Sequence, residues 1–230
     1  MTIEKIFVVE SQCKITHDIS SEREKHMSIK KYRKPKNQNN TLQIHRSLRR
    51  EEVKIVLAKC DELLDSDILK DRKIGILGYV AIGTGLRRSE INELEWDDFI
   101  PEMNMLKCRR LKKRCYYEDV VYISDTLVEK INKYKAGFKV GFLGLCIMQV
   151  RTQGLWDLWK ELLIRANVRH VRLHDARHTR ACMIAESTGS AVAVRDALGH
   201  SNISTSDLYI SRLPSAQLEV ARKTEAYGLV

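Results

Sequence analysis

The residues suited to chemistry gather in the last third of the chain, between Leu173 and Ile210. His174 and Arg177 stand three positions apart at the expected start of a helix, so they share one helical face and can reach the same small anion. A Leu-Gly-His turn supplies His200, and Tyr209 follows nine residues later. No acidic metal cage and no glycine-rich nucleotide loop accompany them in the sequence. The set therefore suits attack on a phosphodiester by a side chain rather than by metal-bound water.

The motifs around these residues resemble those of a known family. The segments HDARHT and LGHSN, with Tyr209 at its spacing, resemble the C-terminal motifs of the tyrosine recombinases, also called the phage integrase family. Upstream, GTGLRRSEINELEWDDF (Gly83–Phe99) resembles the family's first arginine box, and the matching arginine is Arg87. Each motif alone can occur by chance, whereas all of them in family order make a strong signal. The resemblance covers Leu48–Leu213.

The family's catalytic lysine lies on a strand pair, and this sequence predicts a basic β-hairpin over residues 105–124. Between Lys107 and Arg114 there are six basic residues and no acidic one. Counting forward along the first expected strand assigns the lysine to Lys112. Counting back along the second strand favours Lys113 or even Arg114. Because the hairpin is longer than the family pattern, we take Lys112 as the first choice and Lys113 as the alternative.

The resemblance implies that Arg87 and Arg177 clamp the scissile phosphate. Arginine suits this role because its planar, permanently charged fork can hold two oxygens while charge builds up in the transition state. Glu90 and His178 match positions that support the clamp, and the resemblance implies that they orient its groups. Alone, each residue also fits an ordinary structural role; Glu90, for instance, could simply stabilise the first turn of a helix.

The same resemblance implies that Tyr209 is the nucleophile and forms a covalent 3′-phosphotyrosine link. A phenol has an unperturbed pKa of about 10, so it needs a base to accept its proton. His174 is the implied base, and His200 would donate a hydrogen bond to the phosphate. Lys112 would protonate the departing 5′ oxygen. The implied reaction needs no metal ion, no ATP and no other cofactor.

The composition favours an anionic partner. The chain carries 40 Lys and Arg against 30 Asp and Glu, a formal charge of +10. Nucleic acid is the first partner class that this suggests, and a membrane surface the second. No apolar run is long enough to span a membrane, and the N-terminus has no basic leader. The six cysteines never form a C-x-x-C pair, which argues against a zinc site and favours a cytoplasmic, nucleoid-associated protein.

The first part of the chain is the most basic. Met1–Arg50 holds twelve Lys or Arg and five Asp or Glu, a net +7 of the total +10. We expect a basic, flexible arm over residues 1–46 and the catalytic domain over 47–230. The arm is too short for the core-binding domain of typical family members, which the fimbrial phase-switch invertases also lack. Residues expected to contact DNA, in the arm and on the hairpin, are Lys30, Lys31, Arg33, Lys34, Lys36, Arg109, Arg110, Lys113 and Arg114.

The expected fold is a mixed α+β domain, mainly helical with a small antiparallel sheet. Apolar periodicity and capping residues predict a series of helices. Their expected ranges are 49–64, 74–82, 89–94, 125–135, 155–166, 176–188, 191–198 and 216–227, with a further helix that carries Tyr209. The apolar run FLGLCIM before the 155–166 helix is expected to be a loop with a buried segment. Trp96, Trp156 and Trp159 are expected in the core.

The function implied by the resemblance is site-specific recombination of double-stranded DNA. Strand exchange between two duplexes needs four active protomers, so the resemblance implies a homotetramer assembled on DNA, with helix 216–227 reaching a neighbour. Accessory DNA-bending proteins are compatible with this reading. Two alternatives stay open: a type IB topoisomerase, which uses similar chemistry to relax supercoils, and a DNA-binding regulator or decayed integrase remnant that cuts nothing.

Overall fold

The structure is a computed structural model that describes residues 47–112, 115–138, 146–150, 152–211, 213 and 222. They all lie in one compact unit, Gln38–Val230. The expected arm over residues 1–46, the hairpin residues Lys113 and Arg114, and the expected helix 216–227 apart from Arg222 lie outside this description.

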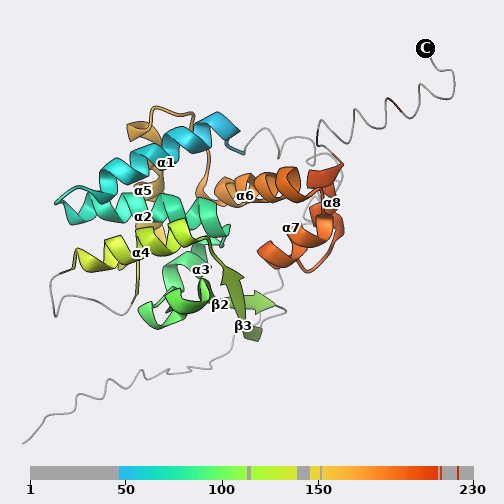
Figure 1. The fold of residues 1–230 in the computed structure, drawn as a ribbon, viewed down its shortest axis with the longest axis horizontal. Coiled ribbons are helices and arrows are strands. Elements are labelled where there is room, and N and C mark those ends of the chain that lie inside the picture. The colour runs from blue at the N-terminus through green and yellow to red at the C-terminus, as the bar shows by residue number, and fades with distance from the viewer. Residues whose placement is uncertain are drawn as a thin grey trace, which may run out of the picture. The chain divides into compact units, whose positions relative to one another are not determined.

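The described chain is mainly helical with one small sheet, as expected (Figure 1). The α-helices are α1 (Arg50–Leu64), α2 (Leu69–Thr84), α3 (Arg88–Glu93), α4 (Asp125–Ala136), α5 (Thr152–Arg165), α6 (Leu173–Thr188), α7 (Ala191–Leu198) and α8 (Ser204–Ile210). Short 3-10 helices η3 (Trp96–Asp98) and η4 (Pro101–Met103) flank strand β1 (Phe99–Ile100), and strands β2 (Met105–Lys112) and β3 (Cys115–Tyr122) follow.

Helix α2 lies at the centre of the helical part and contacts α1, α4, α5 and α6. Its segment IGILGYVAI is buried on every side, which explains why it shows no amphipathic pattern. Gly78 allows α1 to approach closely, because a Cβ at this position would lie 2.3 Å from the Cys60 Sγ. The helix ends at Gly85, whose φ of 67° is the left-handed conformation that favours glycine.

The sheet has the order β1-β2-β3, and both strand pairs are antiparallel. The long pair forms the expected hairpin, with Leu106 opposite Val121 and Lys112 opposite Cys115. Leu106 and Cys108 point inward and belong to the main core. The hairpin therefore packs against the helices through alternate residues of β2.

The last three described helices form a separate corner of the domain. Residues of α6, α7 and α8 share a small apolar cluster, which contains Ala181, Ile184, Ala185, Val194, Leu198 and Tyr209. Glycines in the left-handed conformation end α6 and α7, with φ of 62° at Gly189 and 64° at Gly199. The two short connections fold the chain back on itself and bring α8 against α6.

The structure differs from the expected elements in a few places. The helix expected over 74–82 extends at both ends to Leu69–Thr84 (α2), because its apolar segment is only the buried middle of the helix. The helix expected over 176–188 begins three residues earlier, at Leu173, and ends at Thr188 as expected. Of the FLGLCIM run, Ile147 and Met148 are buried as expected, and the preceding residues lie outside the description. Trp96 and Trp159 are buried, whereas Trp156 is only half-buried.

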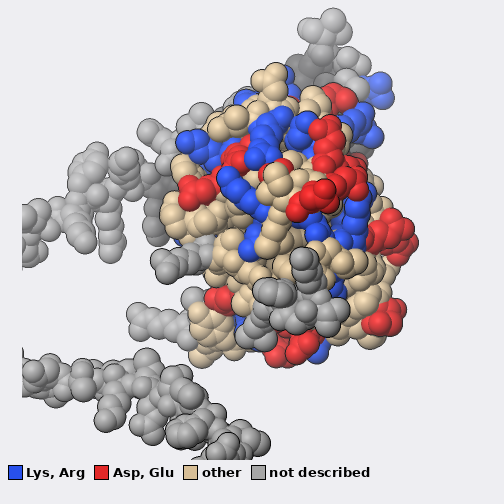
Figure 2. Space-filling view, turned by 90° about the vertical axis from the view of Figure 1, so that its left-hand side faces the viewer, with Lys and Arg blue, Asp and Glu red and all other residues tan. Residues whose placement is uncertain are grey.

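Basic and acidic side chains are interspersed on the face that Figure 2 shows. Many of the described lysines form ion pairs, including Lys54–Glu51, Lys130–Asp61 and Lys70–Glu161. Exposed pairs of this kind contribute little to stability, but they neutralise charge locally. Within the described residues, no helix has both the length and the apolar character needed to cross a membrane.

Candidate active site

Arg87 stands immediately after the turn that ends α2 and immediately before α3. Its backbone N–H donates to Glu90 Oε2 at 2.7 Å, and its Nη1 donates to Glu90 Oε1 at 2.6 Å. Glu90 is buried, while the Arg87 side chain is 42% exposed. One carboxylate thus caps the helix and fixes the direction of the guanidinium, leaving the arginine accessible to an anion.

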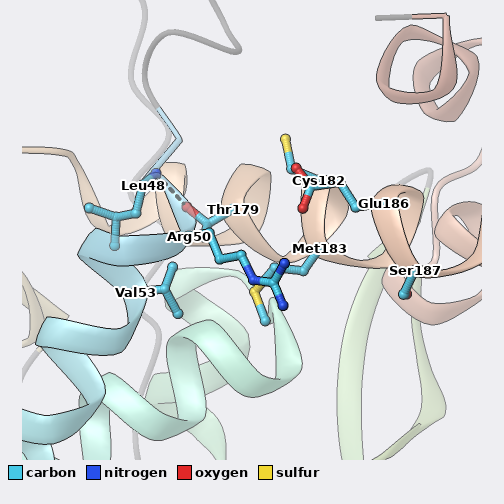
Figure 3. A pocket seen from close by; sticks show the side chains of 8 residues that line it. All are labelled: Leu48, Arg50, Val53, Thr179, Cys182, Met183, Glu186 and Ser187. Atoms are coloured by element: carbon cyan, nitrogen blue, oxygen red, sulfur yellow. Dashed lines mark hydrogen bonds between the residues drawn. The ribbon is translucent and has the colours of Figure 1, made fainter. Parts of the chain in front are cut away.

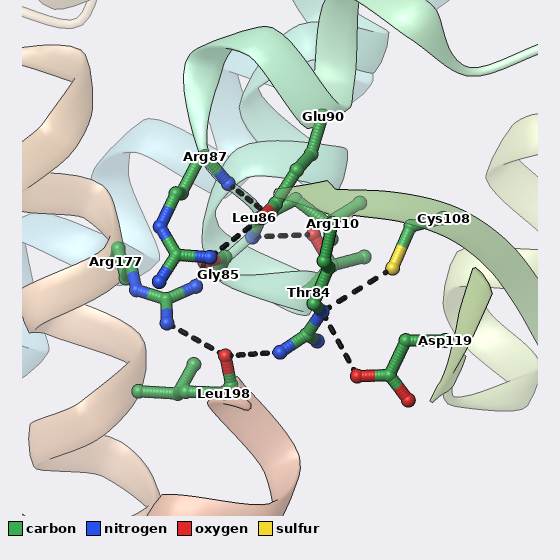
Figure 4. A network of polar contacts seen from close by, with 10 residues as sticks. All are labelled: Thr84, Gly85, Leu86, Arg87, Glu90, Cys108, Arg110, Asp119, Arg177 and Leu198. Atoms are coloured by element: carbon green, nitrogen blue, oxygen red, sulfur yellow. Dashed lines mark hydrogen bonds and ion pairs between the residues drawn. The ribbon is translucent and has the colours of Figure 1, made fainter. Parts of the chain in front are cut away.

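Arg177 is buried and lies between two parts of the chain that are distant in sequence (Figure 4). Its Nη1 donates to the carbonyl of Gly85 at 2.8 Å, and its Nη2 donates to the carbonyl of Leu198 at 2.6 Å. Burial, together with the nearby Arg87, lowers the pKa of Arg177 to about 10. It stays charged at neutral pH, and it ties the turn before Arg87 to the end of α7.

His200 follows the left-handed Gly199 and is half-buried. Its Nδ1 lies 2.9 Å from the hydroxyl of Ser206, which is fully buried. Burial, and then the charges of Arg177 and Arg87, lower the pKa of His200 to about 4. A neutral ring whose Nδ1 accepts from Ser206 carries its proton on Nε2, where it can donate. The role of Ser206 could not be predicted from the sequence, because only the fold of α8 brings this residue back to the histidine.

Tyr209 lies on α8, is buried, and meets His178 of α6. The Tyr209 hydroxyl and the His178 Nδ1 are 2.5 Å apart. Burial and the neighbouring His174 lower the pKa of His178 to about 4, so the ring is neutral and its Nδ1 can accept the phenolic proton. The His174 ring packs edge-on against His178 with centroids 5.1 Å apart. The residue found in contact with the phenol is therefore His178 and not the expected base His174.

His174 stands at the edge of a cavity of about 420 Å³ that Arg87 also lines. Arg88, Arg172 and the half-buried Trp156 complete most of its wall. Partial burial and the charge of Arg177 lower the pKa of His174. A separate cavity of about 350 Å³, between the start of α1 and α6, contains none of the expected catalytic residues (Figure 3). Of these two cavities, the one beside Arg87 and His174 is lined by three arginines and a histidine, whereas the other has one arginine and one glutamate.

The hairpin residues divide into three groups. Lys112 is the last residue of β2, and nothing is described of its side chain; Lys113 and Arg114 lie outside the described residues. Arg109 is exposed and pairs with Glu95 at 3.3 Å. Arg110, which we expected to contact DNA, is only 2% exposed and pairs with Asp119 at 3.0 Å. This arrangement does not support a phosphate contact by Arg110, because the inward side of β2 buries its guanidinium.

Comparison with known proteins assigns the family. The model of the phage integrase family matches residues 46–215. The chain is 32% identical over 166 residues to tyrosine recombinase XerD of Staphylococcus haemolyticus (strain JCSC1435), covering 67% of this chain and 54% of that protein. XerD of Staphylococcus epidermidis (strain ATCC 12228 / FDA PCI 1200) is 28% identical over the same length, with the same coverage of both chains. The chain belongs to the phage integrase family and spans about half the length of these relatives.

Solved structures show the same fold at low sequence identity. The XerH site-specific recombinase bound to a palindromic difH substrate matches with a TM-score of 0.62 and 20% identity, over 76% of this chain and 52% of that one. XerA recombinase matches with a TM-score of 0.59 and 18% identity, over 77% and 65%. The catalytic domain of bacteriophage HP1 integrase gives 0.54 and 22%, over 77% and 93%. The fold is that of a tyrosine recombinase catalytic domain.

Proposed function

We propose that this protein is a site-specific DNA recombinase that cleaves and rejoins DNA through a covalent 3′-phosphotyrosine intermediate, without metal or ATP. The observation that carries this proposal is the convergence of its polar groups. Arg87, Arg177 and His200 interact electrostatically with one another, and Tyr209 lies on the helix that follows His200. Two fixed cations and a neutral donor beside a phenol are what attack on a phosphodiester requires.

The cations act on the transition state. When a fifth oxygen joins the phosphorus, negative charge builds up on the non-bridging oxygens, and Arg87 stands accessible to one of them. Its guanidinium is already oriented by Glu90, so little reorganisation is needed when the phosphate arrives. Removing one such donor typically raises the barrier by about 3–4 kcal/mol. His200 adds a neutral N–H, and the phosphate would raise its lowered pKa on arrival.

The nucleophile needs to lose its proton as it attacks. The contact between the Tyr209 hydroxyl and the His178 Nδ1 makes His178 the first acceptor that we assign to this proton. His174 would then stand at the phosphate edge of the site, beside Arg87. Lys112, with Lys113 as the alternative, remains our assignment for the acid that protonates the departing 5′ oxygen.

The partner that we propose is double-stranded DNA, bound by a homotetramer assembled on two duplexes, in the cytoplasm at the nucleoid. XerH and the Tn1549 transposon integrase, which share the fold, have been solved bound to DNA. The basic arm expected over residues 1–46 would add phosphate contacts. Accessory DNA-bending proteins belong to the same proposal.

The test is the covalent adduct itself. The substrates are nicked suicide duplexes that carry sites flanking the coding sequence of the protein. After incubation with these duplexes, wild-type protein should give a covalent protein–DNA band on a denaturing gel. Tyr209→Phe should abolish this band, because it removes only the hydroxyl that forms the bond. Tyr79→Phe is the matched control, since it removes a buried hydroxyl that binds Asp61 at 2.8 Å, between α1 and α2. That variant should retain the adduct.

Other outcomes separate the alternatives. DNA binding without any adduct, on several sites and at low salt, would contradict the proposal and favour a regulator or a decayed integrase. An adduct with relaxation of supercoiled plasmid, but without exchange between two marked duplexes, would favour a type IB topoisomerase instead.

A further inference from the structure

A third arginine, Arg110, is buried behind the proposed site and has no role in the chemistry above. Its Nη1 donates to the carbonyl of Leu198 at 2.5 Å. Its Nε lies 3.0 Å from Asp119 Oδ2 on the neighbouring strand and 3.5 Å from the Cys108 Sγ (Figure 4). Burying a cation is costly unless it is well paired. The contacts with Asp119 and Cys108 hold the guanidinium within the hairpin, and the contact with Leu198 joins it to the end of α7.

The carbonyl of Leu198 is a shared acceptor. Arg177 and Arg110 both donate to it, from α6 and from β2. Leu198 is the last residue of α7, where the exposed carbonyls of the helix end carry a partial negative charge that favours cations. The next two residues are Gly199 and His200. A contact that fixes this carbonyl therefore also fixes the position of the His200 backbone, from which the imidazole extends.

The packing around Gly199 shows how close the contact is. A Cβ added at Gly199 would lie 1.2 Å from the Arg110 Nη1. The glycine thus serves two purposes: it adopts a φ of 64°, and it leaves room for the guanidinium. The hairpin also touches α7 directly through β3.

We infer that Arg110 is a positioning residue for DNA cleavage: it clamps the C-terminal end of α7 to the β2–β3 hairpin and so holds His200 and Arg177 in their working arrangement. The inference rests on the proposed function. Arg110 acts through the Leu198 carbonyl and touches no phosphate. If it is lost, Arg177 is the one described side chain that still donates to that carbonyl, and the turn that carries His200 can move relative to Arg87. A misplacement of about 1 Å can cost about 100-fold in rate.

The test compares Arg110→Met with a matched control, Arg72→Met. Arg72 makes the same kind of contact far from the site: it donates to the carbonyls of Gly137 and Tyr134 at 2.8 and 2.7 Å, at the end of α4. A role in stability alone would lower the melting temperature of both variants and leave cleavage by the folded protein unchanged in both.

We expect Arg110→Met to bind the DNA site with nearly wild-type Kd and to form the adduct at least about 10-fold more slowly in single turnover, whereas Arg72→Met cleaves normally. In a His200→Ala background the same substitution should cause a smaller further loss than in the wild type, because part of the effect of Arg110 passes through His200. Arg110→Lys, which keeps one donor, should recover part of the rate, and it keeps the test valid if Arg110→Met does not fold.

Nitrogen-15 NMR of the histidine rings supplies a readout independent of cleavage. In the Arg110 variants the His200 signals should shift, while those of the exposed His170 stay unchanged. Cleavage equal to that of Arg72→Met, with unmoved His200 signals, would overturn the inference and leave the proposed function intact. If wild-type protein forms no adduct, the proposed function fails, and the His200 signals still decide whether Arg110 holds that ring.

Discussion

At the scale of single residues, the site combines fixed cations with histidines that stay neutral. Burial is the first cause of the lowered pKa of both His178 and His200, and neighbouring cationic or imidazole groups add to it. A neutral imidazole can accept a proton at one nitrogen and donate a hydrogen bond from the other. A charged ring can only donate, because both of its nitrogens carry protons. The arginines supply charge, and the histidines supply proton chemistry.

This division predicts how stability depends on pH. The pKa of His178 is lowered to about 4 in the folded protein, against about 6.5 in an unfolded chain. Between these values the unfolded state binds more protons, so the stabilising effect is complete above about pH 6.5 and falls as the pH falls toward 4. We expect the melting temperature to fall as the pH is lowered from about 6.5 to about 4, and to fall less steeply in His178→Asn. Thermal unfolding followed by circular dichroism at each pH measures the melting temperature.

The control for this prediction is His170→Asn, since His170 is exposed. It should follow the wild-type curve. If His178→Asn shows the wild-type slope as well, the imidazole does not titrate as a buried neutral group.

At the scale of elements, the site is built from helix ends. Arg87 lies where α2 gives way to α3, the histidine pair opens α6, and His200 follows the end of α7. Helix ends are where backbone groups lack partners within the helix, so side chains from elsewhere can anchor there. Arg177 and Arg110 use the carbonyls at two such ends, which joins elements that the chain order keeps apart.

Alanine substitutions at two glycines can measure how strongly the hairpin is anchored to the end of α7. Gly189 and Gly199 both adopt the left-handed conformation, but a Cβ at Gly189 would meet nothing within 4 Å, whereas one at Gly199 would meet Arg110. Gly189→Ala should cost about 1 kcal/mol in the free energy of unfolding from backbone strain alone. Gly199→Ala should cost more and should also slow cleavage. Chemical denaturation and the adduct assay provide the two values.

Equal losses of stability in these variants, with unchanged cleavage in both, would show that Arg110 moves aside freely. That result would weaken the link between the hairpin and the end of α7.

At the scale of the whole molecule, charge is unevenly distributed along the chain. Met1–Arg50 carries +7 of the net +10, while many described lysines are paired with carboxylates. Sequence-independent attraction to DNA depends on cations that are free to replace condensed counterions on phosphates. The basic N-terminal part should therefore contribute more to DNA affinity than an equal charge on the described surface.

The salt dependence of DNA binding tests this. Replacing five arm cations with Gln (Lys30, Lys31, Arg33, Lys34 and Lys36) should reduce the magnitude of the slope of log K against log[salt] by up to about 4.5, since each phosphate contact contributes about 0.9. The matched control replaces five ion-paired lysines with Gln: Lys54, Lys59, Lys70, Lys130 and Lys133. It removes the same charge and should change the slope little. Equal changes in both sets would mean that net charge alone governs binding.

The sequence by itself determined the family and the mainly helical character, and it identified most residues of the candidate site. Its motifs join residues close in the chain, such as Arg87 with Glu90 and His174 with Arg177, and local spacing determines which helical face they share. The β-hairpin followed from alternation around a basic tip, and the resemblance then assigned roles that neither spacing nor charge could supply.

Only the tertiary structure decided which distant groups meet. In the sequence nothing distinguishes Arg110 from the other basic residues around it. In the structure it lies inside the domain and contacts Leu198, which is 88 positions away in the chain. Likewise, nothing local distinguishes His178 from His174 as the partner of Tyr209; the packing of α8 against α6 selects it. Burial and hydrogen bonding between distant segments depend on how helices pack, and periodicity along the chain carries no record of that geometry.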